Sequence, residues 1–245
     1  MLDIRDRQMS HGPSSARSGS PAPGDRLVQN ASTSFASEHN RDPEGFYARR
    51  GKRYLDVFLV LVTLPLTLLI VVVAAVIVAT DGHNPFYVQR RVGRRGRVFN
   101  ILKLRTMQPD ADARLLDHLA ADPTALSEWS AHQKLKCDPR ITRFGALLRK
   151  TSFDELPQVF NILRGDMSLV GPRPMMVNQV RLYSGKAYFR LRPGLTGFWQ
   201  VSDRNESEFD GRTRHDENYA RSISLWTDIR VILLTVGVVI SGTGY

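Results

Sequence analysis

The longest hydrophobic run of the chain covers residues 57–79 and is interrupted only by Thr63 and Thr67. About 20 apolar residues are enough for a helix to cross the hydrocarbon core of a bilayer. Pro65 lies in the first half of the run, where it removes a backbone donor and clashes with the preceding turn. The pattern therefore predicts one membrane helix that bends at Pro65.

Basic residues stand on both sides of this run and indicate how it enters the membrane. Lysine and arginine cluster within residues 49–53 before it and within residues 90–97 after it. Such clusters favour the cytoplasmic side, so both ends are predicted on the same side. A re-entrant helix that enters, bends at Pro65 and returns meets this requirement. The alternative is a plain single span, since proline also occurs in ordinary membrane helices.

The next pattern is typical of a β-hairpin. Residues 86–92 and 97–105 alternate in part between apolar and polar side chains, and they flank the glycine-bounded turn Gly93-Arg94-Arg95-Gly96. Helical patterns follow. They cover residues 111–120, 124–135, 145–149 and 156–163.

The remaining chain is less regular. Between residues 171 and 207, glycine and proline recur too often for long regular elements. Residues 225–240 are amphipathic at first and then apolar for only about ten residues, which is short of a span. This pattern favours a helix that lies along the membrane interface or packs on the domain.

Composition adds three points. The formal net charge of +10 indicates an anionic partner, for which anionic lipid and nucleic acid both qualify. No recognition-helix or zinc-finger pattern is present, so we expect lipid and no nucleic acid. One cysteine, Cys137, excludes an internal disulfide and fits a reducing compartment. Residues 1–48 are rich in small and polar residues and are predicted to be a disordered tail.

An adjacent acid pair, Asp154-Glu155, follows the basic pair Arg149-Lys150. Taken alone, Ser152 and Glu155 fit the Ser-x-x-Glu capping box of a helix start better than a catalytic site. The neighbouring cations favour the catalytic interpretation, because they and a helix N-terminus would hold the pKa of a carboxylate low and keep it ionised. One carboxylate could then attack phosphorus while the other binds Mg²⁺.

Two further basic sites are candidates for phosphate binding. Arg173 stands between Pro172 and Pro174, which restrict its backbone and present a guanidinium fork that matches a phosphate. The alternative is a rigid turn whose arginine faces water. Lys103 and Arg105 end the second predicted strand on a shared face, although most such pairs are simply solvated.

With these residues the chain resembles the bacterial sugar transferase family, the polyprenyl-phosphate phosphoglycosyl transferases that start exopolysaccharide or O-antigen repeat units. The resemblance covers about residues 50–245 and is closest to the short exopolysaccharide-initiating members. The matching segments, in the family's order, are Lys52-Arg53-x-x-Asp56, Lys103-Leu-Arg-Thr-Met, Asp138-Pro-Arg-Ile-Thr-Arg-Phe-Gly, Leu148-Arg-Lys-Thr-Ser-Phe-Asp-Glu-Leu-Pro-Gln158, Gly165-Asp-Met-Ser-Leu-Val-Gly-Pro-Arg-Pro174 and Arg192-Pro-Gly-Leu-Thr-Gly-Phe-Trp-Gln200.

The resemblance implies a fold and a reaction. The fold is α/β and mostly helical, a monotopic membrane protein with a re-entrant helix, a small β-hairpin and interfacial amphipathic helices. Asp154 would attack the β-phosphate of a UDP-galactose or UDP-glucose, release UMP and form an aspartyl-phosphosugar, which undecaprenyl phosphate would then accept. Glu155 would bind Mg²⁺, and the basic positions would bind phosphate or nucleotide. These are Lys103, Arg149 and Arg173, to which we add Arg105.

The expected organisation follows from both lines of argument. It comprises a disordered tail (1–48), a re-entrant helix with basic flanks (49–82), a catalytic domain (83–224) and an interfacial segment (225–245). We expect the protein at the bacterial inner membrane with its catalytic domain on the cytoplasmic face, bound to anionic lipids. A homodimer is left open. The competing hypothesis is a non-catalytic membrane scaffold of a polysaccharide assembly system, which leaves Asp154 and Glu155 without a role.

Overall fold

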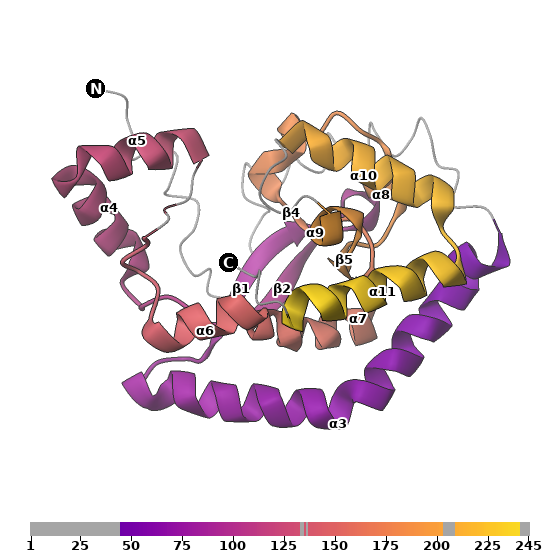
Figure 1. Cartoon of the computed structure of the whole chain (residues 1–245), viewed down its shortest axis with the longest axis horizontal. Helices are drawn as coiled ribbons and strands as arrows, with labels where there is room; N and C mark the ends of the chain where they lie inside the picture. The colour runs from indigo at the N-terminus through magenta and orange to yellow at the C-terminus, as the bar shows by residue number, and fades with distance from the viewer. Residues whose placement is uncertain (1–44, 133–134, 136, 203–208, 241–245) are drawn as a thin grey trace, which may run out of the picture.

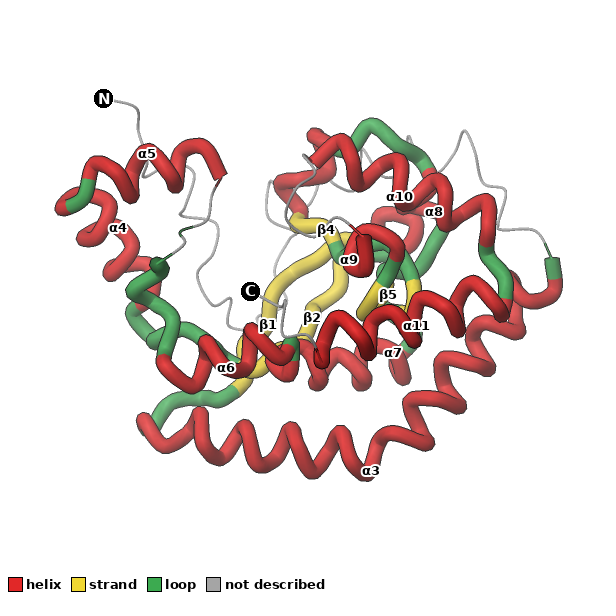
Figure 2. The backbone as a smooth tube through the Cα atoms, in the orientation of Figure 1, coloured by secondary structure: helices red, strands yellow, loops and turns green. Residues whose placement is uncertain are grey.

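A small β-sheet lies at the centre of the computed structural model, with helices around it (Figure 1, Figure 2). The structure describes residues 45–132, 135, 137–202 and 209–240. The elements, in chain order, are η1 (Tyr47–Gly51), α3 (Lys52–Val78), η2 (Ala79–Asp81), β1 (Phe86–Val92), η3 (Arg94–Gly96), β2 (Val98–Leu104), α4 (Ala111–Ala121), α5 (Pro123–His132), α6 (Arg143–Thr151), η4 (Phe153–Gln158), α7 (Val159–Arg164), β3 (Ser168–Val170), β4 (Met175–Met176), η5 (Val177–Leu182), α8 (Ala187–Arg190), β5 (Gly194–Thr196), α9 (Phe198–Ser202), α10 (Phe209–Ser222) and α11 (Leu225–Ile240).

The predicted hairpin is confirmed. Strands β1 and β2 pair in antiparallel fashion, with Phe86 opposite Leu104 and Val92 opposite Val98. The short strand β4 pairs with the end of β1 and gives the order β2-β1-β4. A second sheet joins β3 and β5 in parallel. Its strands have three residues each, in agreement with the glycine- and proline-rich sequence that surrounds them.

Helix α3 contains the whole hydrophobic run, and Pro65 lies inside it. Figure 1 shows that α3 is bent partway along its length. A proline inside a helix removes a backbone hydrogen bond and is a common cause of such a bend. Within the described residues, the helical segment Tyr47–Asp81 is long and apolar enough to cross a membrane. Val60 and Val71 are buried against the rest of the protein, whereas an outer face is exposed. That face carries Phe58, Leu61, Val62, Leu66, Leu69, Val72, Val73 and Val76.

The first turns of α3 are bonded to residues of α7, β3 and α11. Lys52 Nζ forms an ion pair of 2.7 Å with Asp228 of α11. Arg53 donates to the carbonyl oxygens of Ile162 and Leu163 at the end of α7, at 2.5 and 2.9 Å. One turn further, buried Asp56 accepts hydrogen bonds from Ser168 and from the backbone of Leu169. This end of α3 is therefore held by charged groups that pair with fixed partners.

The other end of α3 packs on Leu104 and Leu148 through Ala74 and is also bonded by an arginine. Arg105, just after β2, donates to the carbonyl oxygen of Val78 at 3.1 Å and to Asp81 at 2.7 Å. Its Nε also donates to the carbonyl oxygen of Asn84. Both ends of α3 are thus bonded to the same folded unit.

Helices α4 and α5 form an arm on the left of Figure 2. Their inner faces make a small cluster of buried side chains, to which Trp129 adds. Arg140 stacks over the Trp129 ring at 5.1 Å and connects the arm to the following turn. The helix predicted for residues 124–135 ends earlier, at His132, and Leu135 packs into the cluster from outside the helix.

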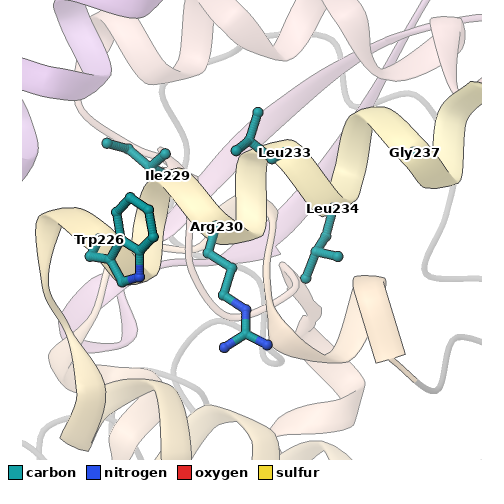
Figure 3. A pocket seen from close by; sticks show the side chains of 6 residues that line it. All are labelled: Trp226, Ile229, Arg230, Leu233, Leu234 and Gly237. Atoms are coloured by element: carbon teal, nitrogen blue, oxygen red, sulfur yellow. The ribbon is translucent and has the colours of Figure 1, made fainter.

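Helix α11 confirms the last helical pattern. Its buried face carries Asp228 and Val231, whereas Trp226, Leu233 and Val236 are half or more exposed. Figure 3 shows a shallow apolar hollow on the exposed face. It is lined by Trp226, Ile229, Arg230, Leu233, Leu234 and Gly237.

Most of the predicted disordered tail lies outside the described residues, which begin at Gly45. Tyr47 and Ala48, at its predicted end, belong to η1. The hydroxyl of Tyr47 donates to Asp228 at 2.6 Å. Two residues that the prediction assigned to the tail are therefore helical.

Candidate active site

The acid pair lies in η4, immediately after α6 ends. Ser152, between the two helices, adopts a left-handed conformation with φ of 57°, and its backbone N–H donates to the carbonyl oxygen of Arg149. Its side chain caps no helix. The capping-box interpretation of Ser152 and Glu155 is therefore wrong, because this serine ends α6 instead of starting a new α-helix.

Helix α6 is placed by contacts at its own start. Thr142 is the N-cap, and its Oγ1 accepts from the backbone N–H of Gly145 at 2.9 Å. A side chain at Gly145 would put its Cβ 2.1 Å from the carbonyl oxygen of Thr106. Glycine at this position lets α6 approach the backbone that follows β2. The approach brings the C-terminal end of α6, and with it Asp154, to the sheet.

Lys103 joins the two carboxylates of the pair. Its Nζ lies 2.7 Å from Glu155 Oε1 and 3.9 Å from Asp154 Oδ2. Arg173 approaches from the turn between β3 and β4, and 3.8 Å separates its Nη2 from Glu155 Oε1. Four residues that the sequence predicted for one site, from three segments far apart in the chain, are therefore brought together.

Arg149 completes this group of cations. Its Nε donates to Thr106 Oγ1 at 2.9 Å, which holds the guanidinium near the end of β2. From there its positive charge lowers the pKa of Asp154, as do the charges of Lys103 and Arg173. Asp154 is thus a carboxylate with three cations around it.

The pKa of Asp154 nevertheless differs from the prediction. Burial is the largest influence and raises this pKa to about 6, with a smaller rise from the charge of Glu155. The residue as a whole is only 9% exposed. The sequence predicted a low pKa, and this prediction is wrong because the loss of hydration outweighs the nearby cations. Asp154 is a carboxylate that titrates just below neutral pH.

Arg105 is not part of this group. Its guanidinium is bonded to Asp81, Val78 and Asn84 at the end of α3, as described above. Lys103 and Arg105 are two residues apart in sequence, yet one contacts the acid pair and the other the membrane helix. The structure places the guanidinium of Arg105 against the end of α3, and its predicted contact with phosphate stays a prediction.

The donor chemistry of the two carboxylates decides whether they can hold a cation. Within the described residues, no group of three or more His, Cys, Asp or Glu side chains is assembled to hold a metal. Asp154 and Glu155 therefore supply two carboxylates at most. Mg²⁺ is commonly held by one or two carboxylates together with substrate phosphates and water, and this pair fits that pattern.

Asn161 is a structural residue of the site that the sequence interpretation missed. It is buried, and its Oδ1 accepts from the backbone N–H of Leu102 at 3.1 Å while its Nδ2 donates to the carbonyl oxygen of Asn100 at 2.7 Å. These two bonds fix α7 to β2 beside Lys103. The sequence did offer a signal for Asn161, which is the one polar side chain within the apolar run Val159-Phe-Asn-Ile-Leu163.

Comparison with known proteins shows the family to which the chain is similar. Residues 47–242 match the family described as bacterial sugar transferase. The chain is 45% identical over 195 residues to a UDP-galactose-lipid carrier transferase of Erwinia amylovora, which covers 79% of this chain and 41% of that protein. It is 43% identical over 199 residues to the exopolysaccharide production protein ExoY of Rhizobium meliloti, covering 79% and 87%.

A third relative is the undecaprenyl-phosphate galactose phosphotransferase of Salmonella typhimurium, with 45% identity over 169 residues, or 68% of this chain and 36% of that protein. The chain thus spans about two fifths or less of the Erwinia and Salmonella proteins and most of the Rhizobium one. The matched range and these identities show that the chain belongs to the bacterial sugar transferase family.

Proposed function

We propose that this protein transfers a hexose 1-phosphate from a UDP-sugar to undecaprenyl phosphate and so starts an exopolysaccharide repeat unit. The observation that carries the proposal is the carboxylate pair Asp154 and Glu155, set among Lys103, Arg149 and Arg173. A nucleophilic carboxylate beside fixed cations suits attack on a diphosphate, whose developing negative charge the cations stabilise. The names of the relatives are in keeping with this reaction.

The reaction takes place in two displacements at one phosphorus. In the first, an oxygen of Asp154 bonds to the β-phosphorus of the UDP-sugar, the bond from that phosphorus to the bridging oxygen breaks, and UMP leaves with the bonding electrons. In the second, a phosphate oxygen of undecaprenyl phosphate attacks the same phosphorus. The bond to Asp154 breaks, and the carboxylate is regenerated as the lipid-linked diphosphate sugar forms.

Each neighbouring residue has a role in this scheme. Lys103 lies between both carboxylates, where it orients Asp154 and offsets charge as UMP departs. Arg149 and Arg173 approach the pair from two further segments and bind phosphate oxygens. Glu155 would hold Mg²⁺, which when bound neutralises charge on the phosphate oxygens.

The attachment of α3 supports a re-entrant helix over a single span. A span places its two ends on opposite faces of a bilayer, about 30 Å of hydrocarbon apart. Here Lys52 and Arg53 bond one end, and Arg105 the other, to the same folded unit. The exposed apolar faces of α3 and α11 would then contact lipid, and the catalytic domain would lie on the cytoplasmic face of the inner membrane.

The direct test is a panel of UDP-sugars with the purified full-length protein in lipid nanodiscs. UMP release, with undecaprenyl phosphate and Mg²⁺ present, should be fastest with UDP-galactose or UDP-glucose and should stop on chelation. The absence of UMP from every UDP-sugar would contradict the proposed reaction. An unchanged yield of polymer from cells that carry an Asp154 and Glu155 double variant would instead favour the scaffold hypothesis.

The pKa of Asp154 gives the first half-reaction a definite pH dependence. Only the ionised carboxylate attacks, so UMP release without acceptor should fall roughly tenfold per pH unit below a midpoint at about 6 and level off above pH 7. Lys103 lowers this pKa, so Lys103→Met should move the midpoint upward. Rapid-quench measurements from pH 5 to 8 provide the readout.

The matched control for this profile is Lys150→Met, because Lys150 is exposed and close in sequence to the acid pair. Its midpoint should equal that of the unaltered protein at the same Mg²⁺ concentration. A rate that is flat from pH 5 to 8 would contradict the assignment of Asp154 as the ionising nucleophile.

The membrane topology can be tested with single cysteines. The native thiol Cys137 is exposed and is first removed as Cys137→Ser. Phe46→Cys and His83→Cys then place one thiol before α3 and one after it, both at exposed positions. A membrane-impermeant maleimide should label both from the cytoplasmic side in inverted vesicles. Protection of one position, with labelling only in right-side-out vesicles, would indicate a complete span.

A further inference from the structure

Strand β1 carries a row of polar side chains beside the acid pair that has no role in the scheme above. Tyr87, Gln89 and Arg91 alternate along β1 and therefore share one face of the sheet. Tyr87 lies directly opposite Lys103 of β2, and opposite residues of an antiparallel pair point to the same face. The row thus starts beside the lysine that bonds Glu155. Tyr87 is 48% exposed, so this end of the row is accessible from solvent.

The other end of the row reaches the turn that presents Arg173. Strand β1 lies between β2 and β4 (Figure 1), and its pairing with β4 includes only Arg91 and Val92. Nη1 of Arg91 donates to the carbonyl oxygen of Pro174 at 3.4 Å, next to Arg173 in the chain. Nη2 of Arg173 in turn lies 3.8 Å from Glu155 Oε1. Both ends of the row therefore adjoin a cation that contacts Glu155.

Gln89 fixes the orientation of the Arg91 side chain. Nη2 of Arg91 donates to Gln89 Oε1 at 2.6 Å. A guanidinium has no acceptor, so the amide turns its oxygen toward Arg91 and its Nε2 donors away from it. Gln89 is thus a positioning residue for the guanidinium.

The Arg91 guanidinium has hydrogen-bonding capacity to spare. Its bonds to Gln89 and Pro174 use only part of its N–H donors, and the bond to Pro174 is long. Nε is shielded from solvent and has no hydrogen-bond partner among the described residues. In the part of the chain that the structure describes, no ion pair joins Arg91 to a carboxylate. This cation therefore has donors that match an anion and no protein anion bonded to them.

Arg91 keeps its charge although it is partly buried. Burial lowers the pKa of Arg91 to about 10, and the charge of Arg173 also lowers it. The groups that raise this pKa are Tyr188, Glu155 and Tyr87. Arg91 is therefore a cation at neutral pH. Shielding a cation from water without an ionic partner is costly, and an anion that binds to it offsets that cost.

We propose that Arg91, oriented by Gln89, is a further phosphate-binding residue of the active site. Its ligand is a phosphate group of the reaction, either in the diphosphate of the UDP-sugar or on undecaprenyl phosphate, and the two sources have different kinetic signatures. The inference rests on the proposed function for this ligand. The remaining N–H donors of Arg91 match phosphate oxygens, whereas a role confined to the long bond with Pro174 leaves them unused.

The test compares Arg91→Gln with the unaltered full-length protein in nanodiscs, by titration calorimetry with UDP and by the KM for each substrate. A donor phosphate at Arg91 predicts about tenfold weaker UDP binding and a similar rise in the KM for the UDP-sugar, because a charge-assisted bond is lost. An acceptor phosphate predicts that rise in the KM for undecaprenyl phosphate instead, with UDP binding unchanged. UDP affinity and both KM values within about twofold of the unaltered protein would overturn the inference.

A double variant separates phosphate binding from a purely structural role in the turn. If Arg91 acted only by holding the turn that presents Arg173, Arg91→Gln would have no further effect in an Arg173→Gln protein. We expect a further rise of about threefold or more in the same KM, because each arginine contacts phosphate by itself. The absence of any further rise would overturn the inference.

The positioning role of Gln89 has its own readout. Gln89→Leu should raise the same KM as Arg91→Gln does, but by a smaller factor, because Arg91 keeps its charge and loses its orientation. A KM equal to that of the unaltered protein would show that Gln89 does not position Arg91.

The matched control is Arg97→Gln, because Arg97 lies in the same hairpin and is exposed. It should leave UDP binding and both KM values unchanged, and circular dichroism checks that each variant is folded. A loss for Arg91→Gln no greater than that for Arg97→Gln would overturn the inference. Failure of the proposed function gives a different result, since the unaltered protein would then release no UMP from any UDP-sugar, whatever Arg91→Gln does to UDP binding.

Discussion

Replacing Asp154 by asparagine should lower UMP release from the preferred UDP-hexose by about a thousandfold or more. An amide cannot form the aspartyl-phosphosugar, and loss of a nucleophile typically removes most of the catalytic acceleration. The donor should still bind, because Lys103, Arg149 and Arg173 remain. Chromatographic measurement of UMP, together with calorimetric binding of the UDP-sugar, separates the chemical defect from a binding defect.

The control for this prediction is Asp117→Asn, an exposed position on α4, which should keep full activity. Asp154→Asn with turnover within about tenfold of the unaltered protein would contradict the covalent route. It would leave direct transfer of the phosphosugar between donor and acceptor as the simpler account.

Replacing Asp228 by alanine should destabilise the protein by about 3–5 kcal/mol, the usual cost of removing one partner from a buried ion pair. Asp228 is 1% exposed and receives hydrogen bonds from Tyr47, Lys52 and Tyr219, at 2.6 to 2.7 Å. Without the carboxylate, the Lys52 ammonium at the start of α3 loses its ion pair of 2.7 Å. Urea unfolding in detergent micelles measures the loss.

Glu217→Ala is the comparison, since Glu217 pairs with Arg221 at the surface. Exposed pairs of this kind contribute about 0.5 kcal/mol or less. Asp228→Asn should fall between the two, because the amide oxygen can still accept from Tyr219. A loss below about 1 kcal/mol for Asp228→Ala would show that the link between α3 and α11 is not a main source of stability.

The elements that were predicted correctly are those whose pattern is local. The hairpin followed from alternation around a glycine-bounded turn, and α3 from an uninterrupted apolar run that contains Pro65. The composition of the acid pair was equally visible. The contact between the acid pair and Lys103 could not be seen in the sequence. Lys103 lies 52 residues from Glu155 and reaches it only through the packing of η4 on β2.

The errors arose where tertiary contacts decide between local alternatives. Ser152 fits a helix start and a helix end equally well by pattern, and the approach of α6 to Thr106 selects the end. Arg105 follows strand β2, whose Lys103 contacts the acid pair. The nearby end of α3, however, offers Arg105 carbonyl and carboxylate partners. The pKa of Asp154 depends on burial, which neighbouring residues in the sequence do not reveal.

The buried carboxylates show the same limit. Asp56 was part of a recognised motif, but nothing local indicated that Ser168 and Leu169 bind it. Asp228 was interpreted as the polar face of an amphipathic helix, whereas it is buried among two tyrosines and a lysine. A single charge in an apolar pattern predicts equally well a solvated face or a buried link between helices.

The central claim is that Asp154 itself carries the sugar phosphate. Mass spectrometry of acid-quenched reactions, with the preferred UDP-hexose and no acceptor, tests this claim most directly. The account predicts a hexose-phosphate adduct on the peptide that contains Asp154, its disappearance when undecaprenyl phosphate is added, and its absence from Asp154→Asn. Accumulation of lipid-linked product with no adduct at any quench time would contradict it.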